Sequence, residues 1–446
     1  MRYLKIIIIL CTVTSVSCSS FLDEKPDISL QEPSTLDDLE ALLNHENTLN
    51  GYLPSIGEIA SDYYYLDDQG YASRLENARL YYVWDPNALT DNTWTFSMNQ
   101  IFYHNLVLER VDHVEVGNLA ESDRNRIKGT AMFMRAMVYF NLALIYAEQY
   151  IPGTNGSMVS IPLKRTPDIN EAVRMANLEE LFSFIETELL LAADLLPVET
   201  ALKTKPDQLA AKALLSRYYL SLGQWEESIV HAASALKYHQ ASLLDFNQID
   251  VGRPIPFSRQ NEETLFYMTV SGNESVFSPS FANVDTVLYR SYEDTDLRKR
   301  AFFASSNNRT VFKGSYTGAN NSTLFAGITT AELYLNLSEC YIRLGQVETG
   351  LSYLNVLLQN RYESGQFVPY NDMEQRGALG LVRLERMKEM CFKGGIRWMD
   401  LKRYSIQPDS DIVLRRTING QTHILDINQR PVPFQLPQIV RENMGE

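Results

Sequence analysis

Residues 381–404 of this chain read LVRLERMKEMCFKGGIRWMDLKRY, and they decide its fold. The apolar residues of the first half recur at intervals of three and four: Leu381, Leu384, Met387 and Cys391. This spacing predicts a helix that buries the face carrying them, with most of its basic side chains elsewhere. Gly394 and Gly395 are expected to end this helix, because two successive glycines interrupt a helical pattern.

A second short helical pattern follows the two glycines and mixes a large aromatic residue, Trp398, with charged residues. Asp400 lies three residues from both Arg397 and Arg403, so the three side chains can form ion pairs on one helix face. Charges buried beside a tryptophan need such partners. We interpret the group as a structural network rather than as catalytic residues.

The order of residues here resembles the C-terminal signature of the SusD/RagB family of outer-membrane nutrient-uptake lipoproteins. The resemblance rests on Glu385-Arg386, Glu389-Met390, Phe392-Lys393-Gly394 and the run from Arg397 to Arg403. Other stretches that are similar to the family are Phe21 to Asp27, Arg135 with Tyr139, Phe140 and Leu142, Asp296 to Arg300, and Val432 to Gln438. The resemblance implies a surface lipoprotein that captures a nutrient and covers a SusC-like TonB-dependent transporter as a hinged lid.

The composition is that of an ordinary globular protein, with 45% hydrophobic and 21% charged residues in 446. The net charge of −15 argues against a nucleic-acid partner and against electrostatic docking on anionic lipid.

The first 17 residues have the features of a signal peptide. Arg2 and Lys5 precede an apolar run from Ile6 to Val13, and small residues lead to Cys18. We expect Cys18 to be the lipid-modified first residue of an outer-membrane lipoprotein that faces outward, followed by a tether over 18–33. The alternative is an ordinary residue near the cleavage site of a soluble protein, since Ser15 stands where lipoprotein signals prefer leucine.

Two cysteines of the mature body, Cys340 and Cys391, lie within helical patterns. They are expected to be small core residues rather than a disulfide. No Cys or His spacing typical of a metal site is present, so we expect neither a metal nor a cofactor.

Residues 63–103 are rich in aromatic side chains, with eleven in 41 residues against 11% for the whole chain. Carboxylates and amides are interleaved with these rings, a mixture that suits stacking on sugar rings and hydrogen bonding to their hydroxyls. The alternative for each ring is a place in the core. The candidate glycan-binding residues are Tyr65, Asp67, Asp68, Tyr71, Tyr82, Trp84, Asn87, Tyr289 and Tyr292.

The middle of the chain predicts a mainly α fold built as a tetratricopeptide-like scaffold of about four helix pairs. Helices are expected from Thr35 onward and over 99–116, 127–149 and 178–195. Residues 215–228 and 337–350 are identical at 7 of 14 positions, and each contains a Leu-Gly-Gln that suits the turn between two antiparallel helices. Such pairs could stack into one continuous core.

A loop-rich, mixed insertion over 246–327 separates the two repeats and is expected to form the ligand surface. Its candidate exposed rings are Phe277, Tyr289, Tyr292 and Tyr316. The predicted organisation is therefore a helical N-terminal region over 34–245, the insertion, and a C-terminal region over 328–446.

Searches for catalytic motifs find no nucleophile elbow, metalloprotease helix or phosphate-binding loop. Paired acids such as Asp67 and Asp68 could in principle serve a glycosidase, but such pairs are frequent by chance. The favoured function is non-enzymatic capture of a glycan for the transporter. The alternatives are capture of a peptide, as in RagB-like proteins, and cleavage of a glycan.

Overall fold

The computed structural model describes residues 32–88, 92–172, 174–238, 241–270, 276, 278–319, 323–407, 411–429 and 434–443. The predicted signal peptide, Cys18 and all but the last two residues of the predicted tether lie outside the described residues. Phe277 and the Val432-Pro433 part of the closing segment lie outside them as well.

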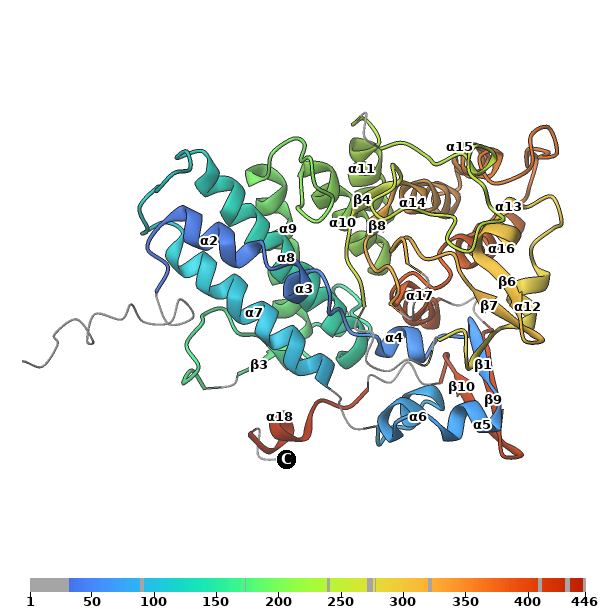
Figure 1. Ribbon diagram of the computed structural model, residues 1–446, viewed down its shortest axis with the longest axis horizontal. Coiled ribbons are helices and arrows are strands. Elements are labelled where there is room, and N and C mark those ends of the chain that lie inside the picture. The colour runs from blue at the N-terminus through green and yellow to red at the C-terminus, as the bar shows by residue number, and fades with distance from the viewer. Residues whose placement is uncertain are drawn as a thin grey trace, which may run out of the picture.

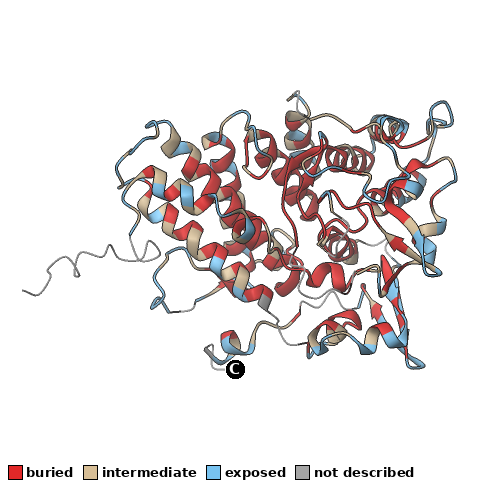
Figure 2. Ribbon diagram, viewed as in Figure 1, coloured by how far each residue is buried: buried red, intermediate tan, exposed pale blue. Residues whose placement is uncertain are grey.

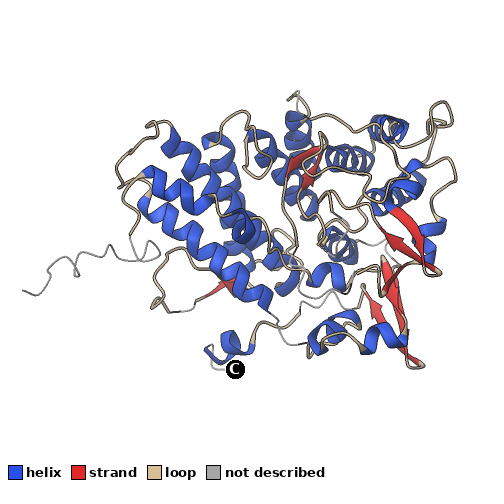
Figure 3. Cartoon of the chain, in the orientation of Figure 1, coloured by secondary structure: helices blue, strands red, loops and turns tan. Residues whose placement is uncertain are grey.

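The fold is mainly helical, as the sequence predicts (Figures 1 and 3). Its long helices contact one another in chain order, from α7 to α11 and on to α14, α15 and α16. Their bounds are α7 Asn92–Arg110, α8 Asp123–Tyr146, α9 Leu178–Leu195, α10 Gln208–Ser221, α11 Trp225–Ala235, α14 Thr330–Arg343, α15 Val347–Gln359, α16 Gln375–Glu389 and α17 Ile396–Ser405. Figure 2 shows that the helices at the centre of this stack are buried on nearly all sides.

The predicted N-terminal helix is present as α2, Leu36–Leu43, and its start has a clear cause. The Thr35 hydroxyl accepts a hydrogen bond from the Asp38 amide, and the Asp38 carboxylate accepts one from the Thr35 amide. This reciprocal pair satisfies backbone donors that a helix start leaves unpaired. Short helices follow: α3 Glu46–Leu49, α4 Ile56–Ile59, α5 Asp68–Ala72 and α6 Glu76–Tyr82.

The two repeats form the expected helix pairs, α10 with α11 and α14 with α15. Gly223 and Gly345 stand at the turns with φ of 72° and 78°, a backbone conformation that suits glycine. The predicted helix over 178–195 is α9, and it packs between α8 and α10 of the first repeat. The pairs therefore form one continuous row rather than separate units.

In the described part of the chain, strands occur as five two-stranded antiparallel sheets. The pairs are β1 Tyr64–Leu66 with β5 Ala282–Val284, β2 Val159–Pro162 with β3 Met175–Asn177, β4 Thr264–Phe266 with β8 Ile328–Thr329, β6 Phe303–Ser306 with β7 Arg309–Phe312, and β9 Val413–Ile418 with β10 Gln421–Asp426. The helices α12 Thr286–Arg290, α13 Leu297–Phe302 and α18 Gln438–Asn443 and the 3-10 helix η3 Phe246–Gln248 complete the described elements. The β1–β5 pair fastens the insertion to the aromatic-rich segment.

The face that α16 buries is not the predicted apolar one. Leu384 is 39% exposed, and Leu381 and Met387 are only partly buried, whereas Arg386 and Glu389 are fully buried. The prediction fails for Leu384 and holds only in part for Leu381 and Met387, whereas Cys391, just beyond the helix, is buried. Apolar spacing does not register charges that are paired inside the protein.

The partners of these charges come from distant parts of the chain. Arg361 binds both Glu263 and Glu389 at 2.9 to 3.0 Å. Arg298 binds Asp296 and Glu385. The ion pairs therefore lock the insertion onto α16, which gives these buried charges a structural role.

The predicted pairing within α17 is half correct. Arg403 does bind Asp400, at 2.8 Å, and also Glu339 of α14. Arg397 instead binds Asp62, which precedes β1. The fold brings Asp62 close to Arg397, so Arg397 pairs with Asp62 rather than with Asp400 three residues away.

The two glycines between α16 and α17 do not end α16 as predicted, because this helix stops at Glu389, five residues before Gly394; they lie at the start of α17 instead. Gly395 adopts φ of 80°, and α17 begins at the next residue. A Cβ on Gly394 would lie 2.2 Å from the Cβ of Ala326, so this position also needs glycine for close packing.

Cys340 and Cys391 are both free and buried, as predicted. Among the described residues, none of the helices has the length and apolarity needed to cross a membrane.

Candidate functional site

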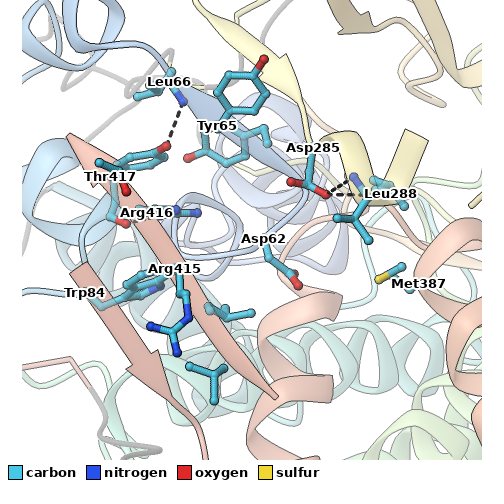
Figure 4. Close-up of a pocket in the computed structure, with 15 residues that line it drawn as sticks. Asp62, Tyr65, Leu66, Trp84, Asp285, Leu288, Met387, Arg415, Arg416 and Thr417 are labelled. Carbon is cyan, nitrogen blue, oxygen red and sulfur yellow. Dashed lines mark hydrogen bonds between the residues drawn. The ribbon is translucent and has the colours of Figure 1, made fainter. Parts of the chain in front are cut away.

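A pocket of about 410 Å³ lies between β1, α12 and β9. Figure 4 shows how three parts of the chain meet there: the aromatic-rich segment, the insertion and the C-terminal hairpin. Tyr65, Trp84, Asp285, Val287, Arg415 and Arg416 are among its lining residues. The insertion, which the sequence predicts to form the ligand surface, supplies one wall of this pocket through α12.

The floor of the pocket is a stack around Arg416, which is only 6% exposed. Its guanidinium carbon lies 3.8 Å from the ring centroid of Tyr82 and 4.5 Å from that of Trp84. Its nitrogens donate hydrogen bonds to the carbonyl oxygens of Ile59, Ser61 and Tyr82. Cation–π contacts of this kind are strong when water is excluded, so they stabilise the floor of the pocket.

Tyr82 and Trp84 therefore do not form the exposed stacking platform that the sequence suggested. They are 1% and 7% exposed, and the Trp84 indole donates a 2.8 Å hydrogen bond to the carbonyl oxygen of Ala60. Arg416 occupies the ring faces that a sugar would need. Both rings support the pocket from below.

All eleven aromatic residues of the segment 63–103 are described, and Tyr65 is the only one of them classed as exposed, at 42%. The other ten are buried or partly buried. The alternation of β1 explains why: Tyr64 and Leu66 point into the core, so Tyr65 points out of it. The Leu66 amide, on the inward side, donates to the Tyr82 hydroxyl at 2.8 Å. The strand thus anchors Tyr65 at the mouth of the pocket.

One edge of β9 contributes backbone groups to the pocket. Ile418 and Gln421 flank the two-residue turn Asn419-Gly420, so their peptide groups bond to each other across the hairpin. By the alternation of antiparallel strands, the peptide groups of Val413, Arg415 and Thr417 then face away from β10. These three residues line the pocket, and their peptide groups bond to none of the described residues.

The carboxylates of the pocket are already engaged. Asp62 accepts two 2.7 Å hydrogen bonds from Arg397. Burial alone would raise the pKa of Asp62, but the Arg397 cation outweighs that penalty and holds this pKa below its usual value. Asp285 caps α12 by accepting from the amides of Val287 and Leu288.

Asp67 and Asp68, two further candidates, are exposed but have structural roles beside the pocket. Asp67 caps α5 through the Gly70 amide and binds Arg309 at 3.1 Å. Asp68 accepts a hydrogen bond from the Asn419 amide at the hairpin turn, at 2.8 Å. They hold the pocket's surroundings together rather than line it.

The remaining candidates are not brought to the pocket lining. Tyr71 is partly buried against Tyr82, and Asn87 is exposed beside Asp85. Tyr292 is 2% exposed and donates from its hydroxyl to the Lys388 carbonyl oxygen, so its assignment as an exposed ring was wrong. Tyr289 is partly buried against Phe303, and Tyr316 is buried.

Sequence reasoning missed Asp285, Val287 and the whole of β9. The hairpin had a readable signal, because an Asn-Gly pair, typical of a two-residue hairpin turn, stands at positions 419 and 420. That signal predicts a hairpin but gives no indication that its edge lies against β1.

Two family models match the chain. Residues 20–220 match a model described as "Starch-binding associating with outer membrane". Residues 248–433 match the model of the SusD family. No curated protein matches this chain.

Solved structures share the fold at low sequence identity. A SusD superfamily protein from Bacteroides vulgatus is 18% identical, with a TM-score of 0.75 over 93% of this chain and 98% of that one. One from Bacteroides thetaiotaomicron is 18% identical, with a TM-score of 0.73 over 92% and 98%. A SusD-like carbohydrate binding protein from Bacteroides vulgatus is 18% identical, with a TM-score of 0.63 over 88% and 89%.

Proposed function

Because this chain belongs to the SusD/RagB family, we propose that it is a non-enzymatic outer-membrane lipoprotein that binds a glycan in the pocket between β1, α12 and β9. Similarity to a starch-binding family and to a carbohydrate-binding structure supports this ligand class.

The observation that carries the proposal is the exposed ring of Tyr65 above a polar pocket. An aromatic face can stack on the C–H face of a sugar. The peptide groups along the edge of β9 and the hydroxyl of Thr417 then offer donors and acceptors for sugar hydroxyls. The pocket combines the two kinds of contact that sugar recognition needs.

The chemistry of the pocket favours binding over cleavage. A glycosidase needs one protonated carboxyl group as its general acid and a second, ionised one. Asp62 is held ionised by Arg397, and Asp285 accepts two backbone hydrogen bonds as a helix cap. Neither is placed to donate a proton.

Capture of a peptide is a second candidate, and the open edge of β9 favours it. An extended peptide could pair with the backbone of Val413, Arg415 and Thr417 as an added strand. Glycan capture remains the first candidate because the Tyr65 ring and the starch-binding similarity both favour it.

In this proposal Cys18 carries the lipid anchor, 18–33 is the tether, and the body covers a SusC-like TonB-dependent transporter as its lid. The family membership and the outer-membrane description of the matched model support this arrangement. The protein would hold the ligand outside the cell and deliver it to the transporter.

Binding of the full-length, detergent-solubilised protein to a glycan array and to a matched peptide library tests the proposal. We expect retention on one class of glycan without release of reducing ends. Selective retention of peptides would favour the second candidate, and release of reducing ends would favour an enzyme.

A further inference from the structure

The pocket differs from the rest of this acidic protein in the sign of its unpaired charge. The chain carries a net charge of −15, yet the two carboxylates of the pocket are engaged by Arg397 and by the start of α12. The two arginines that line it, Arg415 and Arg416, form no ion pair with any described carboxylate.

Arg415 stands on the outward face of the hairpin at the mouth of the pocket (Figure 4). Ile424 lies opposite it on β10, so the cross-strand neighbour provides no counter-charge. Asp426 lies two pairs further along, opposite Val413, and its carboxylate accepts a hydrogen bond from the Asn428 amide instead. The guanidinium is therefore free to bind a ligand.

Arg416 adds positive charge from beneath. Its guanidinium is bound by carbonyl oxygens and aromatic faces, which carry no net charge. Its positive charge is therefore not neutralised by an ion pair, and charges act more strongly through a buried site than through water. The floor and the mouth of the pocket thus favour the same kind of ligand.

We propose that the glycan is anionic, that Arg415 binds the carboxylate of one of its uronic acids, and that Tyr65 stacks on a sugar ring of the same glycan. Planar guanidinium groups recognise carboxylates through two parallel hydrogen bonds, which neutral sugars do not offer. This inference rests on the proposed function, because it names the substrate class of the same pocket.

Binding of the full-length protein to polygalacturonate, alginate and hyaluronan, each paired with its carboxyl-reduced form, tests the inference. We expect at least one charged polymer to bind about tenfold tighter than its reduced form, and this preference to weaken as salt screens the charges. Arg415→Gln should remove the preference. Arg376→Gln is the matched control, because Arg376 is an exposed arginine outside the pocket.

Equal binding of both forms, sensitive to Tyr65→Ala but not to Arg415→Gln, would overturn the anionic ligand and leave the glycan site intact. Absence of any Tyr65-dependent glycan binding would overturn the proposed function and this inference with it. Arg415-dependent binding of acidic peptides in place of glycans would overturn the glycan as the ligand.

Discussion

Arg397 of α17 and Asp62 beside β1 lie 335 residues apart in the chain and form a two-pronged ion pair, with both N–O distances at 2.7 Å. Asp62 lines the pocket, and Arg397 belongs to the stretch that identifies the family. The family signature is therefore connected to the candidate site by a direct contact.

Replacing Arg397 with Met should lower the free energy of unfolding by roughly 2–4 kcal/mol, because it leaves the Asp62 carboxylate without its partner. Chemical denaturation measures this loss. Arg300→Met is the matched control, since the Arg300–Glu363 pair is exposed and should cost less than about 1 kcal/mol. Equal losses in the two variants would contradict a special role for the Arg397–Asp62 pair.

Glu58 predicts a specific dependence of stability on pH. It is buried, its Oε1 atom has no hydrogen-bond partner among the described residues, and Oε2 accepts from the Gly395 amide at 3.0 Å. Burial raises its pKa to about 7. The folded protein thus holds a proton that the unfolded chain releases above its ordinary pKa near 4.5.

Because the folded state binds the extra proton, Glu58 should lower stability progressively as pH rises from about 4.5 to 7. Glu58→Gln keeps the acceptor for Gly395 but removes this titration. The difference in unfolding free energy between the variant and the natural protein should grow through that window, reaching about 3 kcal/mol at pH 8. A difference that is constant with pH would show that Glu58 does not titrate there.

The helical fold could be predicted because it follows from local spacing. The capped start at Thr35, the helix over 178–195 and the Leu-Gly-Gln turns of the two repeats all depend on residues a few positions apart. The buried face of α16 could not be predicted in this way, because the partners of Glu385 and Glu389 are distant in the sequence. They are Arg298 in α13 and Arg361 after α15.

The same reason limits the prediction of the site. The aromatic segment does line the candidate pocket, but only the fold decides which rings are covered. Tyr82 and Trp84 are buried because Arg416, more than 330 residues later, packs against them. Tyr65 stays exposed because the alternation of β1 points its side chain outward.

The anchor predicts a change in location. Cys18→Ala should move the protein from the membrane pellet to the soluble fraction, because acyl chains bind a bilayer in proportion to their buried length. Cys11→Ala, inside the predicted leader, is the control and should leave the protein in the pellet. Retention of the Cys18 variant in the pellet would contradict the lipid anchor.

The lid predicts a stable partner. The tagged protein should co-purify at a fixed ratio with a SusC-like barrel from detergent-solubilised outer membrane, with an interface above the ~2,000 Å² typical of obligate complexes. Removing residues 19–33 should weaken hinged attachment and leave glycan affinity unchanged, because the pocket lies in the body. Recovery without any barrel in several mild detergents would favour a free-standing binder.

The most direct test is calorimetric titration of the natural protein and of Tyr65→Ala with the glycan selected by the array. We predict that the variant binds more weakly by about 1–2 kcal/mol, which is roughly fivefold to thirtyfold, and unfolds at the same denaturant concentration. Leu75→Ala, which removes an exposed apolar side chain outside the pocket, should change neither quantity. Trp84→Ala should lower the unfolding free energy by about 3–5 kcal/mol instead. Unchanged glycan affinity in Tyr65→Ala would contradict the pocket as the binding site.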